Sequence, residues 1–372
     1  MRIGVPREIK PQEFRVGLMP DGVRDLVAHG HHVVVEAGAG IGIDATDEDY
    51  RGAGAVVLGD ADAVFDQADM IVKVKEPQAV ERARLRPDQI LFTYLHLAPD
   101  EPQTSELIAS GTTCIAYETI TDAHGGLPLL KPMSQVAGRL SVQAGARALE
   151  RAQGGRGLLL GGVPGVGPAR VAVIGGGVVG ENAVEMALGL GADVTVLDRN
   201  PAALERLAHR FGAALTTLYA SRATLERTVI DADMVIGAVL VAGAGAPKLV
   251  SRDMVARMRK GTVLVDVAID QGGCFDTSRA TTHDEPTFIV EDVVHYCVAN
   301  MPGAVPLTST QALTNATLPF VLRLADQGWR AALKADPHLR RGLNVAGGQV
   351  TCQPVAEAQG LPFTAPETLL DG

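Results

Sequence analysis

The stretch Val171-Ala-Val-Ile-Gly175-Gly-Gly177-Val-Val-Gly180 decides which fold the sequence predicts. A short apolar run leads into glycines with the spacing G-x-G-x-x-G, and a helix is predicted directly after it, over Val178–Leu190. In such a strand–turn–helix, the first glycine permits the tight turn, the second lets the backbone approach a pyrophosphate, and the third lets helix and strand pack closely. The helix N-terminus also attracts negative charge. The stretch therefore predicts a Rossmann-type unit with a dinucleotide site.

An acidic residue follows at the distance that a ribose contact requires. A second strand, predicted over Asp193–Leu197, leads directly into Asp198, about where a carboxylate accepts hydrogen bonds from the ribose hydroxyls. Asp198 should repel a 2′-phosphate and so favours NAD. Arg199 beside it could offset part of that repulsion, which leaves some use of NADP open. The alternative is a glycine-rich turn without a ligand, and the strand before the turn and the acid after it weigh against that alternative.

Short strand-like runs alternate with helical stretches on both sides of this fingerprint. In the first half, strands are predicted over Arg2–Val5, His32–Glu36, Met70–Val74, Ile90–Tyr94 and Thr112–Ala116, and helices over Pro20–His29, Ala61–Gln67 and Glu101–Ser110. In the second half, further strands are predicted over Val171–Ile174, Met234–Ala238 and Thr262–Val267, and a helix over Ala202–Phe211. This alternation predicts parallel sheets built from βαβ units. The expected fold class is α/β, with two Rossmann-like domains of mostly parallel sheets, separated by a cleft and joined by long helices.

Three stretches outside these series organise the chain. Met133–Ala152 lacks proline and is rich in helix formers and small residues, so we expect one long helix that links the two domains. Gly154–Pro168 is rich in glycine and proline and is expected to be a loop. The tail from Thr308 is predicted to be helical, most strongly over Leu313–Leu324. We expect it to pack on the first domain, because a lone helix needs a partner for its apolar face.

The composition excludes several classes of protein. The 372-residue chain is 47% hydrophobic and carries a net charge of −10, which argues against nucleic acid or an anionic membrane as a partner. Cys114, Cys274, Cys297 and Cys352 show neither CxxC nor zinc-ligand spacing, as is typical of a reducing compartment. The start does not resemble a signal peptide, and the apolar runs are too short to span a bilayer. We therefore expect a soluble, cytoplasmic protein.

Two candidate catalytic groups end neighbouring predicted strands. Lys75 closes the strand that begins at Met70, and His96 follows the strand over Ile90–Tyr94. Ligands of open α/β sheets bind at the carboxyl ends of strands, so both side chains are candidates to line one crevice. A lysine there can polarise a carbonyl, and a histidine can exchange protons near neutral pH. The alternatives are a solvated strand end for Lys75 and a hydrogen-bonded structural role for His96.

Two further charged residues are candidates for the same chemistry. Asp270 follows a predicted strand of the nucleotide domain and is expected to face the interdomain cleft near the nicotinamide end. Its alternative role is that of a turn-forming Asp before two glycines. Arg15, in Glu13-Phe-Arg-Val, could clamp a substrate carboxylate with two hydrogen bonds. Its alternative is an ordinary surface arginine.

Three neighbouring histidines do not predict a metal site. His29, His31 and His32 stand around Gly30, where a helix is expected to end and a strand to begin. No carboxylate or cysteine stands at a spacing that would complete a ligand set. We interpret these histidines as structural.

Several motifs along the chain together carry a family resemblance. In the first half they are Gly4-Val-Pro-Arg-Glu-Ile-Lys, Glu13-Phe-Arg-Val, Lys73-Val-Lys-Glu-Pro and Phe92-Thr-Tyr-Leu-His-Leu-Ala. Further on they are Pro132-Met-Ser-Gln-Val-Ala-Gly-Arg, Asp266-Val-Ala-Ile-Asp-Gln-Gly-Gly and His295-Tyr-Cys-Val-Ala-Asn-Met-Pro-Gly-Ala-Val-Pro. By these motifs the chain resembles the bacterial alanine dehydrogenases, within the alanine dehydrogenase/transhydrogenase α-subunit superfamily, nearly from end to end. The full set separates it from transhydrogenase α subunits and saccharopine dehydrogenases.

The resemblance implies an activity and a set of roles. It implies reversible, NAD-dependent conversion of L-alanine to pyruvate and ammonia by a homohexamer. Arg15 would bind the substrate carboxylate, Lys75 would contact the carboxyl and keto oxygens, His96 would be the acid–base group, and Asp270 would be the second catalytic residue. The substrate domain would be discontinuous, made of residues 1–132 and 306–372, around an NAD-binding domain of residues 133–305.

The same resemblance, together with the glycine fingerprint, implies the residues that contact NAD. They are Ser134, Gly175, Gly177, Val178, Val179, Gly180, Asp198, Val239, Leu240, Val267, Ala268, Ile269, Asp270, Arg279, Val298, Ala299, Asn300 and Met301. Two positions depart from the family pattern: Gln135 stands where Glu is expected, and Leu307 where Arg or Lys is expected. Neither position belongs to the catalytic set.

Two other functions stay open at this point. One is a stand-alone relative of the transhydrogenase α subunit, which would exchange hydride between two nucleotides and would need a membrane partner. The other is a nucleotide-sensing protein without catalysis, which predicts a damaged catalytic set. The joint presence of Lys75, His96 and Asp270 weighs against both.

Overall fold

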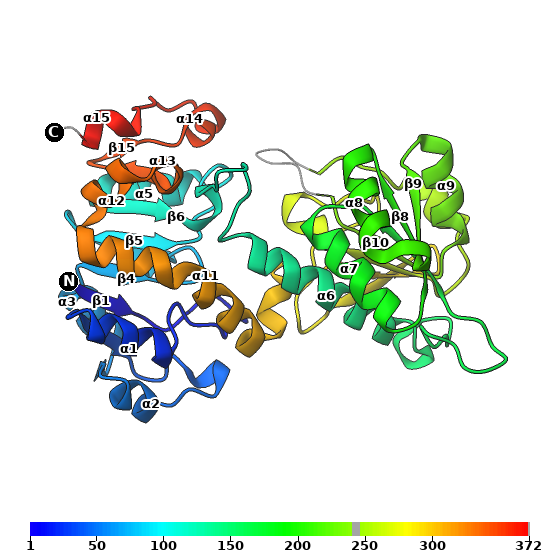
Figure 1. Ribbon diagram of the computed structural model, residues 1–372, viewed down its shortest axis with the longest axis horizontal. Coiled ribbons are helices and arrows are strands. Elements are labelled where there is room, and N and C mark those ends of the chain that lie inside the picture. Colours follow the sequence, from blue (N-terminus) through cyan, green and yellow to red (C-terminus); the bar gives the residue numbers. More distant parts are fainter. Residues whose placement is uncertain (240–245, 371–372) are drawn as a thin grey trace. The chain divides into compact units, whose positions relative to one another are not determined.

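The computed structural model describes residues 1–239 and 246–370, and the chain divides by its contacts into two units (Figure 1). Unit 1 comprises Met1–Met133 with Val305–Gly372, and unit 2 comprises Ser134–Ala304. Each unit is built around one mostly parallel sheet with helices packed against it, so the predicted α/β class is confirmed. No helix in the described part of the chain is long and apolar enough to cross a membrane.

The sheet of unit 1 has eight strands in the order β15-β14-β6-β5-β4-β1-β2-β3. All pair in parallel except β14 and β15, which join one edge in antiparallel pairs. The strands are β1 (Arg2–Val5), β2 (His32–Glu36), β3 (Val56–Leu58), β4 (Met70–Val72), β5 (Ile90–Thr93), β6 (Thr113–Ala116), β14 (Leu343–Ala346) and β15 (Gln349–Val350). The helices are α1 (Pro20–Ala28), α2 (Asp47–Gly52), α3 (Ala61–Gln67), α4 (Ala79–Arg82), α5 (Glu101–Ser110), α11 (Pro306–Gln327), α12 (Trp329–Ala335), α13 (Pro337–Arg340), α14 (Gln353–Gln359) and α15 (Pro366–Leu370).

The sheet of unit 2 has seven strands in the order β12-β13-β11-β10-β7-β8-β9, with β12 antiparallel at one edge. The strands are β7 (Arg170–Ile174), β8 (Asp193–Asp198), β9 (Leu215–Tyr219), β10 (Met234–Gly237), β11 (Val263–Asp266), β12 (Thr287–Val290) and β13 (Val293–Tyr296). The helices are α6 (Lys131–Ala148), which begins in unit 1, and α7 (Val178–Gly189), α8 (Pro201–Phe211), α9 (Arg222–Asp231) and α10 (Arg252–Ala256). Short 3-10 turns include η5 (Val267–Gln271) and η6 (Met301–Ala304).

Apolar runs explain why the central strands lie where they do. Every residue of β4, β5 and β6 in unit 1, and of β10, β11 and β13 in unit 2, is buried. Strands covered by helices on both faces need such continuous apolar sequence. Each fully buried Val, Leu or Ile contributes about 1.5–3 kcal/mol through its removal from water. These strands form the core, and their carboxyl ends carry the loops that matter for function.

The two chain ends of unit 1 pack together, which confirms the expected return of the tail. α11 contacts α1, and β14 pairs with β6. The two strands β14 and β15 were not expected in the tail. The Gly347-Gly348 turn between them has positive φ at both positions, which is the pattern of a tight hairpin.

The long helix between the two strand series has different ends from those expected. α6 begins at Lys131 rather than at Met133, because Pro132 is tolerated in the first turn, where its missing N–H has no helical partner. It ends at Ala148 rather than at Ala152. Beyond this point the N–H of Gly155 donates to Glu150 O at 3.1 Å, so the chain turns back instead of continuing the helix.

Candidate active site

Polar side chains gather where four parallel strands of unit 1 end. β1, β4, β5 and β6 run in the same direction and are consecutive in the sheet, so their carboxyl ends share one edge. Shortly after these ends come Glu8, Lys75, His96 and Glu118. The chain order reverses between β1 and β4, and open α/β sheets bind ligands outside the carboxyl ends at such a point. Lys75 and His96 therefore follow neighbouring strands at a typical ligand-binding edge.

A buried ion-pair triad joins the segments that follow β1 and β4. Lys73 Nζ lies 2.7 Å from Glu81 Oε1 and 3.2 Å from Glu8 Oε2. Burial opposes the charge on Lys73, but the two carboxylates outweigh it and raise its pKa. Burial is the main cause that raises the pKa of Glu8; the positive charge of Lys73 opposes this effect, and the neighbouring carboxylate of Glu81 adds to it. Glu8 Oε1 also accepts the N–H of Val74 at 2.7 Å and that of Lys75 at 3.4 Å, so the triad fixes the backbone that carries the partly exposed Lys75.

Arg15 is buried and held by its neighbour in the same motif. Its Nε donates to Glu13 Oε1 at 2.6 Å and its Nη2 to Glu13 Oε2 at 2.5 Å, while Nη1 lies 3.0 Å from Met133 Sδ. Burial opposes the charge on Arg15, but Glu13 outweighs it and raises the pKa of the guanidinium. With 2% of its surface exposed, Arg15 is not the surface arginine of the alternative interpretation. A thioether is a weak acceptor, so a substrate carboxylate would be a stronger partner than Met133 for Nη1.

His96 occupies a backbone conformation that side chains rarely adopt. Its φ is +51°, in the left-handed region, where non-glycine residues are uncommon and often functional. Glu118 stabilises this turn: its Oε1 accepts the N–H of His96 at 2.6 Å and that of Leu95 at 3.2 Å. The imidazole is about half exposed, lies with Nδ1 3.9 Å from the same carboxylate oxygen, and stacks on Tyr94 with a centroid distance of 5.8 Å. The ring is thus presented outward by a fixed loop.

Tyr94 connects Arg15 and His96. Burial raises the pKa of Tyr94 against the positive charge of Arg15, which lies close enough to act on it. Its ring is parallel to that of His96, and its hydroxyl donates to Leu129 O at 2.6 Å. Thr93, one residue earlier, donates through Oγ1 to Lys75 O at 2.9 Å. The segment at the end of β5 therefore contacts Lys75 and His96, and Arg15 lies close enough to influence the pKa of Tyr94 in this segment.

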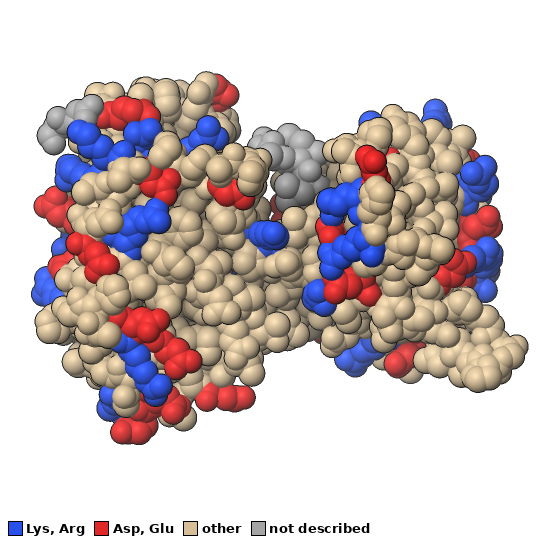
Figure 2. All heavy atoms as spheres, viewed as in Figure 1, with Lys and Arg blue, Asp and Glu red and all other residues tan. Residues whose placement is uncertain are grey.

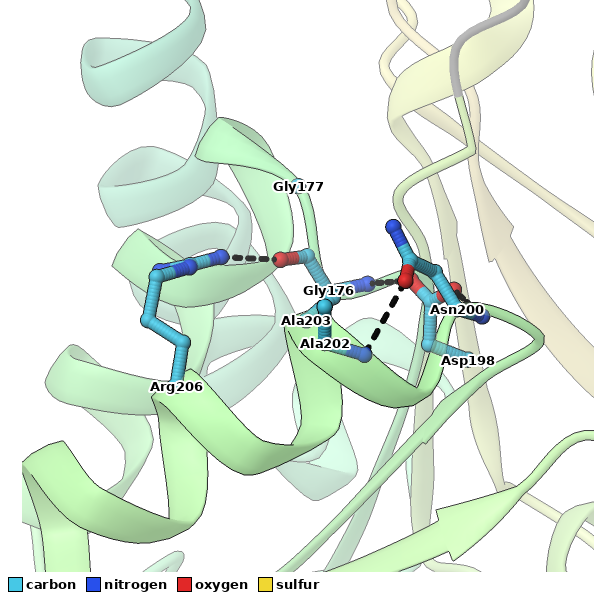
Figure 3. Close-up of a pocket in the computed structure, with 7 residues that line it drawn as sticks. All are labelled: Gly176, Gly177, Asp198, Asn200, Ala202, Ala203 and Arg206. Atoms are coloured by element: carbon cyan, nitrogen blue, oxygen red, sulfur yellow. Dashed lines mark hydrogen bonds between the residues drawn. The ribbon is translucent and has the colours of Figure 1, made fainter.

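In unit 2 a pocket of about 440 Å³ opens beside the glycine fingerprint, between the turn after β7 and the start of α8 (Figure 3). It is lined by Gly176, Gly177, Asp198, Asn200, Ala202, Ala203 and Arg206. Among the predicted NAD contacts within the described residues, Gly177 and Asp198 line this pocket. The order of the strands reverses here too, between β7 and β10. A Cβ on Gly175 would stand 2.6 Å from Ala238 O, so the fingerprint turn lies against the segment that leads from β10 to Val239.

The glycines of the turn fit a dinucleotide. Gly175 has a φ of +104°, which other residues rarely adopt. A Cβ on Gly180 would stand 1.8 Å from Gly175 O, so only glycine permits this close packing of helix on strand. A Cβ on Gly177 would meet nothing within 4 Å, although this residue is the N-cap of α7. The space in front of Gly177 is therefore open to a ligand at the positive end of the helix, which suits a pyrophosphate.

Asp198 is fixed in the orientation that a ribose contact needs. Its Oδ2 accepts the N–H of Gly176 at 2.5 Å, and its Oδ1 accepts the N–H of Asn200 at 2.7 Å (Figure 3). Asn200 in turn caps α8, with Oδ1 3.0 Å from Ala202 N. A carboxylate fixed by two backbone N–H groups at this position would repel a 2′-phosphate in the pocket.

Two loops carry most of the other predicted residues of unit 2. Asp270 is exposed on η5, which directly follows β11. The fully buried Asp266 organises this loop by accepting the N–H groups of Ala268 at 3.1 Å and Cys274 at 2.9 Å. Val298–Met301 follows β13, and Ala299 N donates to Thr281 O at 3.2 Å. Both loops lie at the carboxyl ends of parallel neighbouring strands.

Two further predicted residues, Ser134 and Arg279, do not line the pocket. Ser134 is partly exposed in the first turns of α6. Arg279 is exposed and lies over the ring of Phe288, 4.3 Å from its centroid. Leu240 lies outside the described residues.

Several residues of both sites were not singled out from the sequence. Glu13, Glu8 and Glu118 act by orienting other groups. Glu8 and Glu13 stand within quoted motifs, whereas no motif includes Glu118. Asn200 and Arg206 line the pocket. The dipeptide Asn200-Pro201 is a helix start signal that begins two residues after Asp198, and it could have predicted that α8 borders the site.

Unit 2 has a binding turn for a dinucleotide, and unit 1 has an arginine, a lysine and a histidine around the end of one strand. These two features define the class of protein, which is an NAD-dependent dehydrogenase built from two α/β units. Comparison with known proteins narrows the class. Residues 4–137 match the family described as alanine dehydrogenase/PNT, N-terminal domain, and residues 141–353 match its C-terminal domain. The chain belongs to the alanine dehydrogenase/PNT family.

Individual relatives agree with this assignment. The chain is 60% identical over 370 residues to the alanine dehydrogenase of Halomonas elongata and 56% identical over 370 residues to that of Mycobacterium tuberculosis, with 100% of each chain covered in both cases. A solved L-alanine dehydrogenase superposes with a TM-score of 0.94 at 53% identity, covering 97% of this chain and 99% of the other. A transhydrogenase from Sinorhizobium meliloti superposes with a TM-score of 0.81 at 27% identity, covering 94% and 98%.

Proposed function

We propose that this chain catalyses the reversible, NAD-dependent oxidative deamination of L-alanine to pyruvate and ammonia. The observation that carries the proposal is the convergence of Arg15, Lys75 and His96 on the end of β5, in a chain whose curated relatives with this full-length similarity are alanine dehydrogenases. Each of these groups suits a small 2-oxo or 2-amino acid. The two cations match its carboxylate and carbonyl oxygens, and the imidazole can move the protons that the reaction requires.

The proposed roles follow from the contacts of each residue. Arg15, oriented by Glu13, binds the substrate carboxylate through the guanidinium edge that faces Met133. Lys75 contacts the carboxyl and keto oxygens and favours negative charge there. NAD supplies the hydride acceptor when it is bound. Loss of hydride from Cα of the neutral amine leaves an iminium ion, and His96 removes a proton from the water that attacks it. His96 then returns this proton to the nitrogen of the carbinolamine. The C–N bond breaks as the hydroxyl group loses its proton to solvent, which gives pyruvate and ammonia.

Asp270 is proposed as the second catalytic residue. It is exposed on η5, where its carboxylate can orient the amine or the attacking water and stabilise positive charge on the substrate. Unit 1 is accordingly proposed as the substrate domain. Unit 2 is proposed as the NAD domain, with the predicted residues around its pocket and its two loops as the cofactor contacts. Gln135 and Leu307 are both exposed, and we expect them to affect local charge rather than the reaction.

Glu118 is expected to act through His96. Glu118→Ala removes the acceptor of the His96 and Leu95 N–H groups, so we expect the left-handed turn to relax and kcat to fall about tenfold or more. Glu118→Gln keeps a carbonyl acceptor and should recover most of the lost rate. The affinity for NADH, measured by fluorescence titration, should stay unchanged in both variants. Equal rates for the wild type and Glu118→Ala would show that the turn does not depend on this carboxylate.

We also propose a homo-oligomer, with six copies as in the resemblance, located in the cytoplasm. The loop over Gly154–Pro168 exposes Leu159, Val163 and Val166, and Figure 2 shows no charged side chain at this projecting tip of unit 2. An exposed apolar tip of this kind is typical of contacts between copies. The four cysteines are buried free thiols, which suits a reducing compartment.

The oligomer proposal is tested by the mass in solution. Replacing Leu159, Val163 and Val166 together with serine should lower the molar mass measured by light scattering after size exclusion. The near-UV circular dichroism spectrum should match that of the wild type, which would show that the subunit is still folded. An unchanged mass in the triple variant, or a monomeric wild type, would contradict the proposal.

The proposed reaction is tested by following NADH absorbance with NAD and L-alanine at alkaline pH, beside glycine, serine, glutamate and NADP. Turnover should be greatest with L-alanine and NAD. If the protein binds NADH but shows no turnover with any amino acid, the result would favour a nucleotide sensor. Exchange of hydride between two nucleotides would favour a transhydrogenase-like function.

A further inference from the structure

Gly176 is held by side chains at both of its backbone polar atoms. Its N–H donates to Asp198 at 2.5 Å, and its carbonyl oxygen accepts from Arg206 Nη2 at 2.8 Å (Figure 3). The first contact lies at the expected ribose contact. The second comes from α8, eight positions after Asp198 in the sequence, and was not part of the fingerprint. Gly176 is the variable position between the first two glycines of the motif, so the motif itself does not explain why both atoms are held.

The contact from Arg206 determines the direction of the next N–H group. The carbonyl of Gly176 and the N–H of Gly177 belong to one peptide unit, which is planar and trans. In such a unit the two groups point in opposite directions, so a carbonyl held toward Arg206 directs the Gly177 N–H away from it. Gly177 is the N-cap of α7 and stands in front of open space. An N–H aimed from this position is suited to a phosphate oxygen.

Arg206 is itself fixed by a charge network on α7 and α8. Its Nη1 is paired with Glu181 Oε2, in the first turn of α7, while Nη2 holds the Gly176 carbonyl. Arg210 pairs with the other oxygen of Glu181 and also donates to Glu185 at 2.6 Å. Figure 2 shows basic and acidic side chains gathered over α7 and α8. The planar fork of a guanidinium can bridge a carboxylate and a carbonyl at once, which a lysine ammonium does less well.

We propose that Arg206 is a positioning residue of the cofactor site, which holds the Gly176–Gly177 peptide so that the Gly177 N–H faces the pyrophosphate. The residue acts through the loop and takes no part in hydride transfer. It makes the affinity for a dinucleotide depend on an ion pair outside the fingerprint. The inference rests on the proposed NAD-dependent function and specifies which part of the cofactor this residue serves.

The chain offers a matched control for this proposal. Arg210 lies one helical turn further along α8, pairs with the same Glu181, and has a similar exposed fraction, 44% against 47% of the side chain. It does not line the pocket. Replacing either arginine with methionine keeps much of the apolar stem and removes one charge. The two variants therefore lose the same charge and differ in the contact with the glycine loop.

The test compares the binding of NADH, ADP-ribose and adenosine, using fluorescence titration for NADH and competition for the other two. In Arg206→Met we expect the Kd of NADH and of ADP-ribose to rise about tenfold, because a charge-assisted hydrogen bond that orders the loop is lost. The Kd of adenosine, which has no pyrophosphate, should change less than about twofold, since it is expected to contact only Asp198. Arg210→Met should match the wild type with all three ligands.

Three results would overturn the proposal. One is unchanged ADP-ribose binding in Arg206→Met, and another is an equal loss in Arg210→Met. The third is wild-type affinity in Arg206→Lys, since that would assign the effect to charge rather than to the fork. Failure of the proposed function is distinguished by the wild type alone: if it binds neither NADH nor ADP-ribose, the NAD site itself is absent. Arg206→Lys is expected to recover less than half of the lost binding free energy.

Discussion

His96→Ala is expected to lower kcat for L-alanine about a hundred- to ten-thousand-fold, the usual contribution of a positioned acid–base group. The imidazole is about half exposed at the end of β5, and its turn is stabilised by Glu118 and stacked on Tyr94, so it is presented to a ligand rather than buried as a structural group. Alanine removes the ring without adding bulk. Steady-state kinetics with L-alanine and NAD, and fluorescence titration with NADH, provide the two required measurements.

A second histidine in unit 1 serves as the control for this variant. His32 is exposed at the start of β2, at the opposite, amino-terminal end of that strand from the ligand-binding edge. His32→Ala should therefore keep the wild-type rate. NADH should bind His96→Ala as it binds the wild type, because the proposed cofactor contacts belong to unit 2. A rate for His96→Ala within a few-fold of the wild type would remove this residue from the mechanism.

Gly177→Val is expected to weaken NADH binding by about tenfold to a hundredfold, because the valine side chain would clash with the bound dinucleotide. A Cβ at this position meets no protein atom within 4 Å, and its φ of −74° is accessible to valine. The folded protein should therefore accept the substitution with little change in thermal stability. The added methyl groups would instead occupy the space that the pyrophosphate needs in front of α7.

Two other glycines of α7 show why Gly177 is the informative position. A Cβ on Gly180 would collide with Gly175 O at 1.8 Å, so a variant there would confuse loss of folding with loss of binding. Gly189, at the end of the same helix, meets nothing within 4 Å and lies outside the pocket. Gly189→Ala should leave NADH binding unchanged. Normal NADH affinity in a folded Gly177→Val protein would mean that the dinucleotide does not lie across this turn.

The sequence predicted the parts of the fold that repeat a strong local pattern. β1, β2, α3 and α5 have the predicted bounds, because a continuous apolar strand or a capped helix is specified by neighbouring residues. β14 and β15 were not predicted, since each is short and gains its stability from pairing with a strand more than two hundred residues earlier or with each other. β4 ends at Val72 rather than at Val74. The next residue, Lys73, forms the buried ion pairs with Glu8 and Glu81. Long-range partners of this kind leave no periodic signal.

The candidate sites divide in the same way. The glycine motif and Asp198 could be predicted because their spacing is set by one strand–turn–helix–strand unit. The orienting groups could not, because each acts across the fold: Glu118 lies 22 residues from His96, and Arg206 lies 30 residues from Gly176. The burial of Arg15 could not be predicted from its neighbours in the sequence. It stands beside an exposed Phe14 in a charged stretch, yet Glu13 neutralises it and allows it to be buried.

The most direct test of the proposed chemistry follows the hydrogen on Cα. The wild-type protein would be given NAD and L-alanine that carries deuterium at C2, and the NADH formed would be isolated and analysed by mass spectrometry. Hydride transfer from Cα predicts NADH with one deuterium and pyruvate with none at C2, since that carbon has become a carbonyl. NADH without deuterium, or no NADH from protein that binds the cofactor, would contradict hydride transfer from the amino acid.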